Sequence, residues 1–214
     1  MAGMKVQCGE AARLLSHAAR TKAIAFACTS GSFLEGLGYD ESVAKIIEDA
    51  SGVPAVTTSG SAIAALRALD LKRLAVFSPY DEWVSSRLVA FLEGHDFSVS
   101  HHSWGYDMWG TDVEDCFEPI NDWVTSQVPA DVDGVFISCT NFTWLRGIAP
   151  LEERIGRPVV TANLATLWQL LHTAGAGDRL PMTLARLCRL SPVGANRAEA
   201  DQVERPILNG IKSA

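Results

Sequence analysis

Residues 23–36 read AIAFACTSGSFLEG, and residues 134–147 read GVFISCTNFTWLRG. Each stretch begins with a short apolar run and continues with Cys-Thr and a small polar residue. The likeness continues further along the chain, because residues 47–69 (IEDASGVPAVTTSGSAIAALRAL) match residues 151–174 (LEERIGRPVVTANLATLWQLLHTA). In both copies a Gly-x-Pro turn precedes a Val-Thr pair. The chain therefore carries one structural unit twice.

The rest of the chain alternates short apolar runs with amphipathic stretches, which is typical of an α/β fold with a parallel sheet. We expect strands at 23–28, 54–58, 73–78, 96–101, 134–139 and 158–162, and helices at 10–20, 41–51, 61–69, 82–94, 115–127 and 164–174. The repeat predicts two pseudo-symmetric halves, each a parallel sheet flanked by helices. Because each Cys-Thr pair follows a strand, the two Cys loops would face one cleft between the halves.

The two halves are unequal in length. Residues 1–73 form the first half, which residues 168–214 would complete, and residues 74–167 form the second. The second half has two additional strands and a helix before its Cys loop. We expect that the first half is shortened at the N-terminus, which would expose a sheet edge and favour self-association and weak activity.

Composition excludes several classes of protein. The 214 residues are 48% hydrophobic and 20% charged, enough for one large domain or two small halves. The net charge of −7 and the lack of a basic run argue against a nucleic-acid partner. The sequence shows neither a membrane span nor a secretory signal, and its five cysteines have irregular spacing, so we expect reduced thiols and a cytoplasmic location.

Two thiols that face each other across a cleft suit two kinds of chemistry. They can exchange the roles of acid and base on opposite faces of a carbon centre. Alternatively, one thiolate adds to an alkene, the former double bond rotates, and the other thiol handles the proton. Neither route needs a metal or an organic cofactor.

The reactive form is the thiolate, and an ordinary Cys with a pKa of about 8.5 is only about 3% ionised at pH 7. A helix N-terminus contributes about 0.3–1 kcal/mol to the stability of the thiolate, which is too little by itself. Amide and hydroxyl donors in the CTSGS and CTN loops would add roughly 1.5–3 kcal/mol. We therefore expect the loop donors to lower the pKa of both cysteines and to hold a substrate carboxylate.

The segments ACTSGSFLEG, SGVPAVTTS, FSPY and SCTNFTWLRGIAPLEERIGRPVVTANLATLWQLL resemble the maleate isomerase and arylmalonate decarboxylase branch of the aspartate/glutamate racemase superfamily. The resemblance covers about residues 4–180. It implies cofactor-independent catalysis between two pseudo-symmetric α/β halves. In the decarboxylases of this family the first Cys position is Gly, so Cys28 favours an isomerase or a racemase.

The resemblance also implies the roles of individual residues. Cys28 would be the nucleophile or first acid/base and Cys139 the proton donor or second acid/base. Thr29, Ser30, Thr140 and Asn141 would hold the carboxylate of a small dicarboxylate or amino acid substrate, and Tyr80 would donate its hydroxyl to the same substrate. The chain could form a homo-oligomer.

Other readings remain open. The activity could be that of an arylmalonate decarboxylase or of an aspartate, glutamate or hydantoin racemase, and the chain could also be an inactive remnant or a binder. Adjacent histidines on a strand point to opposite faces, so His101 and His102 do not predict a metal site. Cys8, Cys116 and Cys188 lie in helical stretches and are expected to pack as small apolar residues.

Overall fold

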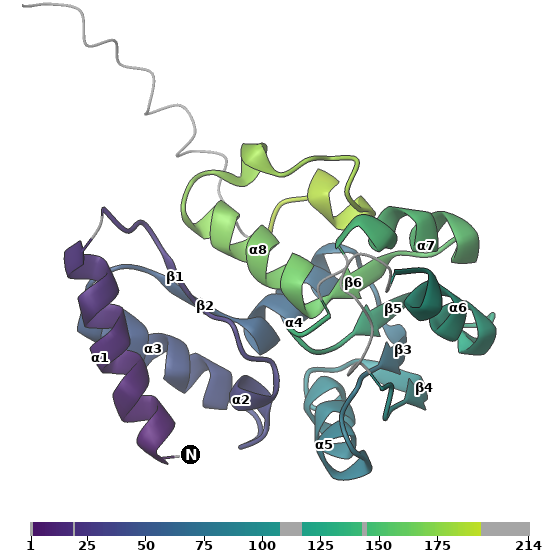
Figure 1. Ribbon diagram of the computed structural model, residues 1–214, viewed down its shortest axis with the longest axis horizontal. Coiled ribbons are helices and arrows are strands. Elements are labelled where there is room, and N and C mark those ends of the chain that lie inside the picture. Colours follow the sequence, from purple (N-terminus) through teal and green to yellow (C-terminus); the bar gives the residue numbers. More distant parts are fainter. Residues whose placement is uncertain (1, 19, 108–116, 143–144, 194–214) are drawn as a thin grey trace, which may run out of the picture.

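The computed structural model describes residues 2–18, 20–107, 117–142 and 145–193. These residues form two parallel sheets flanked by helices, which confirms the α/β class (Figure 1). The smaller sheet pairs β1 (Ile24–Phe26) with β2 (Ala55–Thr57). The larger sheet has the order β4-β3-β5-β6, formed by β3 (Arg73–Phe77), β4 (Ser98–Ser103), β5 (Gly134–Ile137) and β6 (Val159–Thr161).

The helices alternate with the strands along the chain. They are α1 (Ala2–Ala18), α2 (Ser30–Phe33), α3 (Tyr39–Ser51), α4 (Thr58–Ala68), α5 (Glu82–Glu93), α6 (Phe117–Gln127), α7 (Ile148–Ile155) and α8 (Ala162–Thr173), with short 3-10 turns at Leu145–Gly147, Gly177–Arg179 and Arg186–Arg189. Every expected strand is present, most of them shorter than predicted. No range was predicted for helices α2 and α7. The four residues of α2 are too few to show a helical period, whereas α7 buries Ile148, Leu151 and Ile155 at a helical spacing that the sequence analysis overlooked.

The repeat extends to the ends of the helices. Thr57 and Thr161 are the N-caps of α4 and α8, and each side chain accepts a hydrogen bond from the amide three residues further on. Gly52 and Gly156 end α3 and α7 with φ angles of 73° and 71°, a conformation that glycine adopts without a steric penalty. The two units therefore use the same local signals to start and stop their helices.

A carboxylate also occupies the same place in both units. Glu48 accepts a hydrogen bond from the Ala55 amide, and Glu152 accepts one from the Val159 amide. Each bond joins a helix to the strand that follows it, α3 to β2 in the first unit and α7 to β6 in the second. Only Glu152 accepts a second bond, from the Arg186 amide, and it is 4% exposed.

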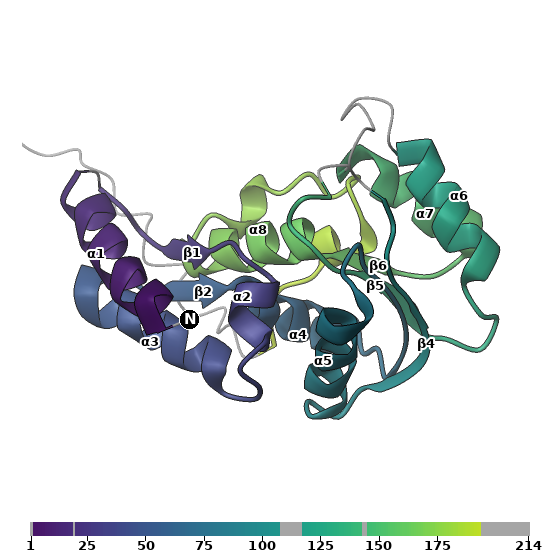
Figure 2. The same ribbon diagram turned by 60° about the horizontal axis from the view of Figure 1, so that its bottom comes forward.

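Helices α4 and α8 pack against each other between the two sheets (Figure 2). The Thr166 hydroxyl on α8 donates to the Thr58 hydroxyl on α4 across 3.1 Å. Because α4 follows β2 and α8 follows β6, this contact places the ends of β2 and β6 near the centre of the molecule.

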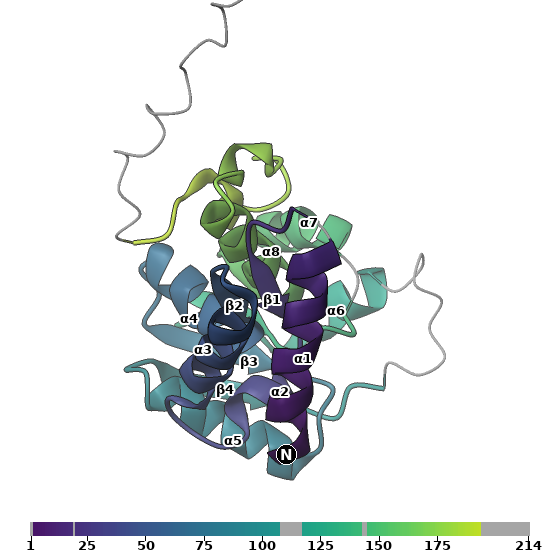
Figure 3. The same ribbon diagram turned by 90° about the vertical axis from the view of Figure 1, so that its left-hand side faces the viewer.

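Most buried apolar residues form one cluster around the larger sheet. The strand residues Leu74, Val76, Phe136 and Val160 in this cluster are at most 1% exposed. A smaller cluster lies under α1 and α3, which pack along each other at the far end of the smaller sheet (Figures 1 and 3). Leu180 and Leu187, after α8, belong to the large cluster.

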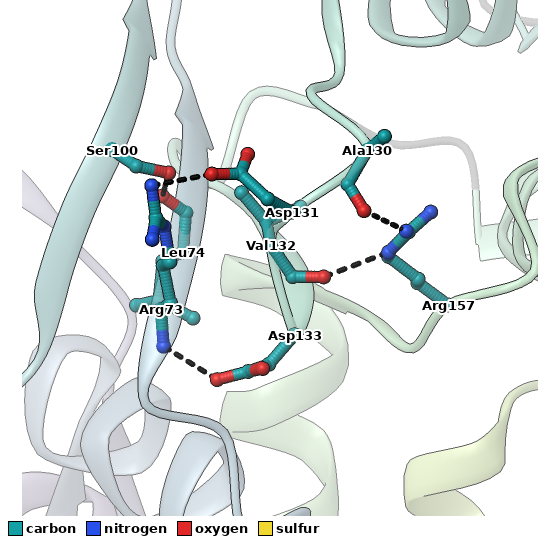
Figure 4. Close-up of polar contacts among 8 residues, drawn as sticks. All are labelled: Arg73, Leu74, Ser100, Ala130, Asp131, Val132, Asp133 and Arg157. Atoms are coloured by element: carbon teal, nitrogen blue, oxygen red, sulfur yellow. Dashed lines mark hydrogen bonds and ion pairs between the residues drawn. The ribbon is translucent and has the colours of Figure 1, made fainter.

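The start of β5 is fixed on both sides by charged side chains (Figure 4). Asp133 accepts hydrogen bonds from the Lys72 and Arg73 amides at 3.0 and 2.7 Å, which lower the pKa of its carboxyl group. From the other side, Arg157 donates to the carbonyl oxygens of Val132 and Ala130. These bonds hold β5 between β3 and β6 and thereby set the position of the Cys loop at its other end.

The sheets differ as the sequence predicts. Strands β5 and β6 correspond to β1 and β2, but the larger sheet continues through β3 and β4. Among the described residues, β1 pairs with β2 alone. Self-association through this edge, and the division into residues 1–73 with 168–214 and 74–167, remain predictions. In the part of the chain that the structure describes, no helix is both long and apolar enough to span a bilayer.

Candidate active site

The two cysteines of the repeat stand at equivalent places, each in the second position after its strand. Cys28 follows β1 and Cys139 follows β5, and both side chains are partly exposed and unoxidised. A negative charge on Cys28 raises the pKa of Cys139. The fold therefore brings Cys28 close enough to affect the ionisation of Cys139, although the loops are far apart in the sequence.

The backbone at Cys139 is strained. Its φ angle is 107°, which is rare for any residue other than glycine. The turn is closed by the Phe142 amide, which donates to the Cys139 carbonyl at 3.3 Å. A second amide, that of Asn141, donates to the Cys139 sulfur at 3.5 Å. The sharp turn thus presents the thiol at the end of the strand and gives it one amide donor.

The Cys139 thiol does not follow the expectation that loop donors lower its pKa. Burial raises the pKa and outweighs the Asn141 amide and the Tyr80 hydroxyl, which both lower it. Desolvation of the thiolate is the physical reason. At neutral pH Cys139 therefore carries its proton, as a proton donor requires.

Two buried serines, Ser32 and Ser59, hold the backbone of the Cys28 loop. Ser32 Oγ donates to the Cys28 carbonyl at 2.8 Å and lies 2.7 Å from Ser59 Oγ. Ser59 Oγ donates in turn to the Thr29 carbonyl at 3.1 Å. These three contacts tie the first Cys loop to the first turn of α4.

The Cys139 loop is held in the same way from α8. Asn163 Nδ2 donates to the carbonyl oxygens of Thr140 and Phe142 at 3.0 and 2.8 Å. Asn163 is the repeat counterpart of Ser59, and Thr140 is the counterpart of Thr29. The sequence prediction missed both supporting residues, although the matched segments VTTS and VTAN place a polar side chain at the same position of each unit.

Gly31 leaves room for the first thiol. A Cβ atom at this position would lie 2.9 Å from Cys28 Sγ and 3.2 Å from the Phe26 ring. Contacts this short do not occur between a Cβ atom and its neighbours, so any larger residue at position 31 would displace the thiol.

Tyr80 connects the two Cys loops. Ser138 Oγ donates to the Tyr80 hydroxyl oxygen at 3.5 Å. Burial raises the pKa of Tyr80, the Cys139 charge raises it further, and hydroxyl groups of Ser138 and Thr29 lower it. The Tyr80 hydroxyl is therefore protonated at neutral pH and lies close to both halves.

The other predicted site residues lie in the same two loops. Ser30 is the first residue of α2 and is partly exposed, and Thr140 is also partly exposed. Asn141 is exposed. Thr29 is 2% exposed, and its Oγ1 makes no hydrogen bond within the described residues, which leaves this hydroxyl for Tyr80 or a ligand.

The remaining candidates lie elsewhere. Burial raises the pKa of Cys8 and of Cys188, whereas Cys116 lies outside the described residues. His101 and His102 follow each other on β4, and burial lowers the pKa of both. Within the described ranges, no three His, Cys, Asp or Glu side chains are grouped so that they could hold a metal ion.

Comparison with known proteins gives one family match. The family model described as arylmalonate decarboxylase matches residues 4–188. A relative is the arylmalonate decarboxylase of Bordetella bronchiseptica, which is 27% identical over 163 residues, or 74% of this chain and 68% of the relative. Another is the maleate isomerase of Pseudomonas putida, 25% identical over 180 residues, or 80% of this chain and 71% of the relative.

A solved structure gives the same fold. The Nocardia farcinica maleate cis-trans isomerase, as a Cys-to-Ser mutant with a covalently bound succinylcysteine intermediate, superposes with a TM-score of 0.76. The two chains are 23% identical, and the match covers 88% of this chain and 79% of the other. At this identity the likeness establishes the two-sheet architecture.

Proposed function

The chain belongs to the arylmalonate decarboxylase family, and from this we propose that it is a cofactor-independent isomerase of a small unsaturated dicarboxylate such as maleate. The observation that carries the proposal is the pair of interacting thiols at Cys28 and Cys139, with the Tyr80 hydroxyl close to both loops. A decarboxylase of this family would have glycine in place of Cys28.

In the first step the Cys28 thiolate forms a C–S bond to one alkene carbon. The π electron pair moves to the neighbouring carbon, which takes the proton from Cys139 Sγ. The product is a succinyl thioether on Cys28 and a thiolate on Cys139. The raised pKa of Cys139 supports this order, since its thiol holds a proton until the substrate carbanion accepts it.

In the second step the former double bond turns as a single bond. The Cys139 thiolate then removes the proton from the same carbon, the double bond forms again, and the C–S bond breaks. The trans product leaves, and both cysteines return to their starting states. No electrons are gained or lost, so the cycle needs no oxidant or reductant.

The loops supply donors for the two substrate carboxylates. Thr29, Ser30 and Thr140 offer hydroxyl groups, and Asn141 offers a side-chain amide. Tyr80 also stabilises the Cys139 thiolate, because its hydroxyl lowers the pKa of that thiol. The net charge of −7 gives no general attraction for a dianion, so the substrate would depend on these local donors.

The relatives support an isomerase without defining the substrate. The Pseudomonas relative is a maleate isomerase, and the Nocardia structure contains a succinylcysteine. A covalent adduct of this kind on Cys28 would be the first intermediate of the proposed reaction.

Mass spectrometry of the intact protein after incubation with maleate tests the proposal. The Cys139→Ser variant should accumulate an adduct of the mass of maleic acid on Cys28, whereas Cys28→Ser should form none. Cys8→Ser is the matched control and should turn over maleate like the unchanged protein. Exchange of a substrate proton with deuterated solvent but no adduct would instead support a racemase, and release of carbon dioxide from a malonate would support a decarboxylase.

A further inference from the structure

A cavity lies on the other side of α4 from the Cys28 loop. Its volume is about 250 Å³, and it is bordered by β2, α3, α4, α8 and the turn after α5. It has no lining residue in common with the Cys28 and Cys139 loops. The proposed isomerase reaction gives this cavity no role.

Four polar atoms of the residues that line this cavity have no hydrogen-bond partner among the described residues. They are Asp40 Oδ1, Ser61 Oγ, His95 Nε2 and Gln169 Oε1. A buried polar atom without a partner costs about 1–3 kcal/mol, and folded proteins contain few of them. Four such atoms around one cavity indicate a missing occupant.

Asp40 defines the chemistry of that occupant. Its side chain is 5% exposed, and no Lys, Arg or His nitrogen lies within ion-pair distance of it among the described residues, although Arg67 and His95 also line the cavity. A buried carboxylate without an ion-pair partner is unfavourable, and a cationic ligand would supply that partner. Burial raises the pKa of Asp40 and outweighs the backbone amides of Glu41 and Asp40 and the charge of His95, which lower it.

The other orphan atoms suit a ligand that donates several hydrogen bonds. Gln169 Oε1 only accepts, and Ser61 Oγ and His95 Nε2 can accept. An alkylammonium group has three N–H donors, enough for Asp40 and two of these acceptors. The walls include Ala44, Ile63 and Ala64, which can contact a short alkyl chain.

Gly60 keeps the floor of the cavity open. A Cβ atom at this position would lie 3.1 Å from Asp40 Oδ2 and 3.0 Å from Thr57 Oγ1. The absence of a side chain leaves the carboxylate free on the side that faces α4.

We propose that this cavity binds a small primary amine, whose ammonium group pairs with Asp40 and donates its other two N–H bonds to acceptors among Gln169, Ser61 and His95. The size of the cavity restricts the ligand to a few heavy atoms beyond the ammonium group. The site is independent of the isomerase reaction, so failure of one proposal would not affect the other.

Calorimetric titration with ethylammonium chloride tests the proposal, with sodium chloride and ethanol as matched controls for salt and for the neutral ligand. We expect saturable binding of ethylammonium, at least tenfold weaker binding to Asp40→Asn, and an unchanged affinity for Asp49→Asn, which alters an exposed carboxylate on the same helix that does not line the cavity. Gly60→Ala should also weaken binding, because its methyl group would enter the cavity and crowd Asp40 Oδ2. Circular dichroism verifies that each variant is folded.

The double variant Cys28→Ser, Cys139→Ser separates this site from the active site, and it should bind ethylammonium as the unchanged protein does. Loss of binding in that variant would place the amine in the active site and overturn the proposal. The proposal is also overturned if ethylammonium shows no saturable binding, which would mean that water fills the cavity, or if Asp40→Asn binds it equally well.

Discussion

Asn163 Nδ2 lies 3.0 Å from the carbonyl oxygen of Thr140, the residue that follows the second cysteine. Ser59 Oγ makes the equivalent contact with the Thr29 carbonyl at 3.1 Å. In both units the first turn of the central helix therefore holds the backbone just after the cysteine. The helices fix the positions of the two thiols through these contacts with the loop backbone.

Asn163→Ala should reduce activity by loosening the Cys139 loop. The variant leaves the carbonyl oxygens of Thr140 and Phe142 without their donor, at a cost of about 1–3 kcal/mol in the free energy of unfolding. Urea unfolding and the rate of maleate isomerisation measure the two effects. Thr173→Val, an exposed change on the same helix, is the control and should alter neither quantity. An unchanged rate in Asn163→Ala would show that the loop keeps its shape without this residue.

Tyr80→Phe removes the hydroxyl that lies close to both loops. A hydrogen bond to a charged group contributes about 1.5–3 kcal/mol, so we expect kcat to fall roughly 10- to 100-fold. Burial raises the pKa of Tyr80 well above its ordinary value, so the unchanged protein should keep this contribution throughout the neutral range. Steady-state kinetics between about pH 6 and pH 8, about one unit on either side of neutrality, measure the loss. Equal rates for both proteins would exclude Tyr80 from the reaction.

Gly31→Ala should displace the Cys28 thiol. The new methyl group would lie 2.9 Å from Cys28 Sγ, so either the sulfur or the α2 backbone must move. We expect slower alkylation of Cys28 by iodoacetamide and at least a tenfold loss of activity, about 1.4 kcal/mol in transition-state stabilisation. Gly9→Ala, in the interior of α1, is the control, because its methyl group would meet Ile46 at an ordinary 3.4 Å. If Gly31→Ala and Gly9→Ala show the same Cys28 alkylation rate and the same activity, the space beside Cys28 does not affect the thiol.

Cys139 should ionise at a higher pH than an ordinary thiol. Burial raises its pKa, so its alkylation rate should still be rising at a pH where that of an ordinary thiol has levelled off. The sign for stability follows from the same shift. The folded state holds the Cys139 proton more tightly than the unfolded state does. The contribution of this proton to the free energy of unfolding is therefore complete below the pKa of the unfolded state, and it is lost as pH rises through the pKa of the folded state.

Peptide mapping after alkylation at a series of pH values measures this profile. Cys28 should be labelled before Cys8, Cys139 and Cys188 at neutral pH, because burial raises the pKa of the other three. From the sequence alone we expected Cys28 and Cys139 to be the two most reactive thiols, and the raised pKa of Cys139 now places only Cys28 first. Labelling of Cys139 that levels off below pH 9 would contradict the assignment.

Glu48 and Glu152 occupy equivalent positions in the two units, so their substitutions can be compared for their effect on stability. Glu152→Ala removes the acceptor for both the Val159 and Arg186 amides at a buried position, whereas Glu48→Ala removes one bond at an exposed position. We expect losses of about 2–3 kcal/mol and about 0.5–1 kcal/mol in the free energy of unfolding. Chemical denaturation measures both values. Equal losses would show that burial and the second bond add nothing.

The sequence alone established the repeat and, with it, much of the fold. The Gly-x-Pro turns and the strands after them could be recognised in the sequence, because Gly52 and Gly156 act on the backbone within a few residues of themselves. The N-cap roles of Thr57 and Thr161 were seen only in the structure. Helix α2 was missed because its four residues are too few to show a helical period, and no range was predicted for α7 although its buried residues follow one.

The tertiary structure decided how the cysteines behave. Sequence reasoning placed Cys139 at the end of a strand with donors nearby, and it predicted a lowered pKa. The structure buries this thiol, and desolvation outweighs the Asn141 amide, so its pKa rises. Burial depends on residues from the whole chain, and no local pattern contains that information.

The cavity beside Asp40 depends on the tertiary structure in the same way. Asp40, Ser61, His95 and Gln169 belong to four separate segments, and neither Cys loop contains any of them. Their polar atoms converge only when α3, α4, α8 and the turn after α5 pack together. The sequence fixes elements whose signals act over a few residues, whereas desolvation and the convergence of distant side chains arise from packing, which the folded chain alone determines.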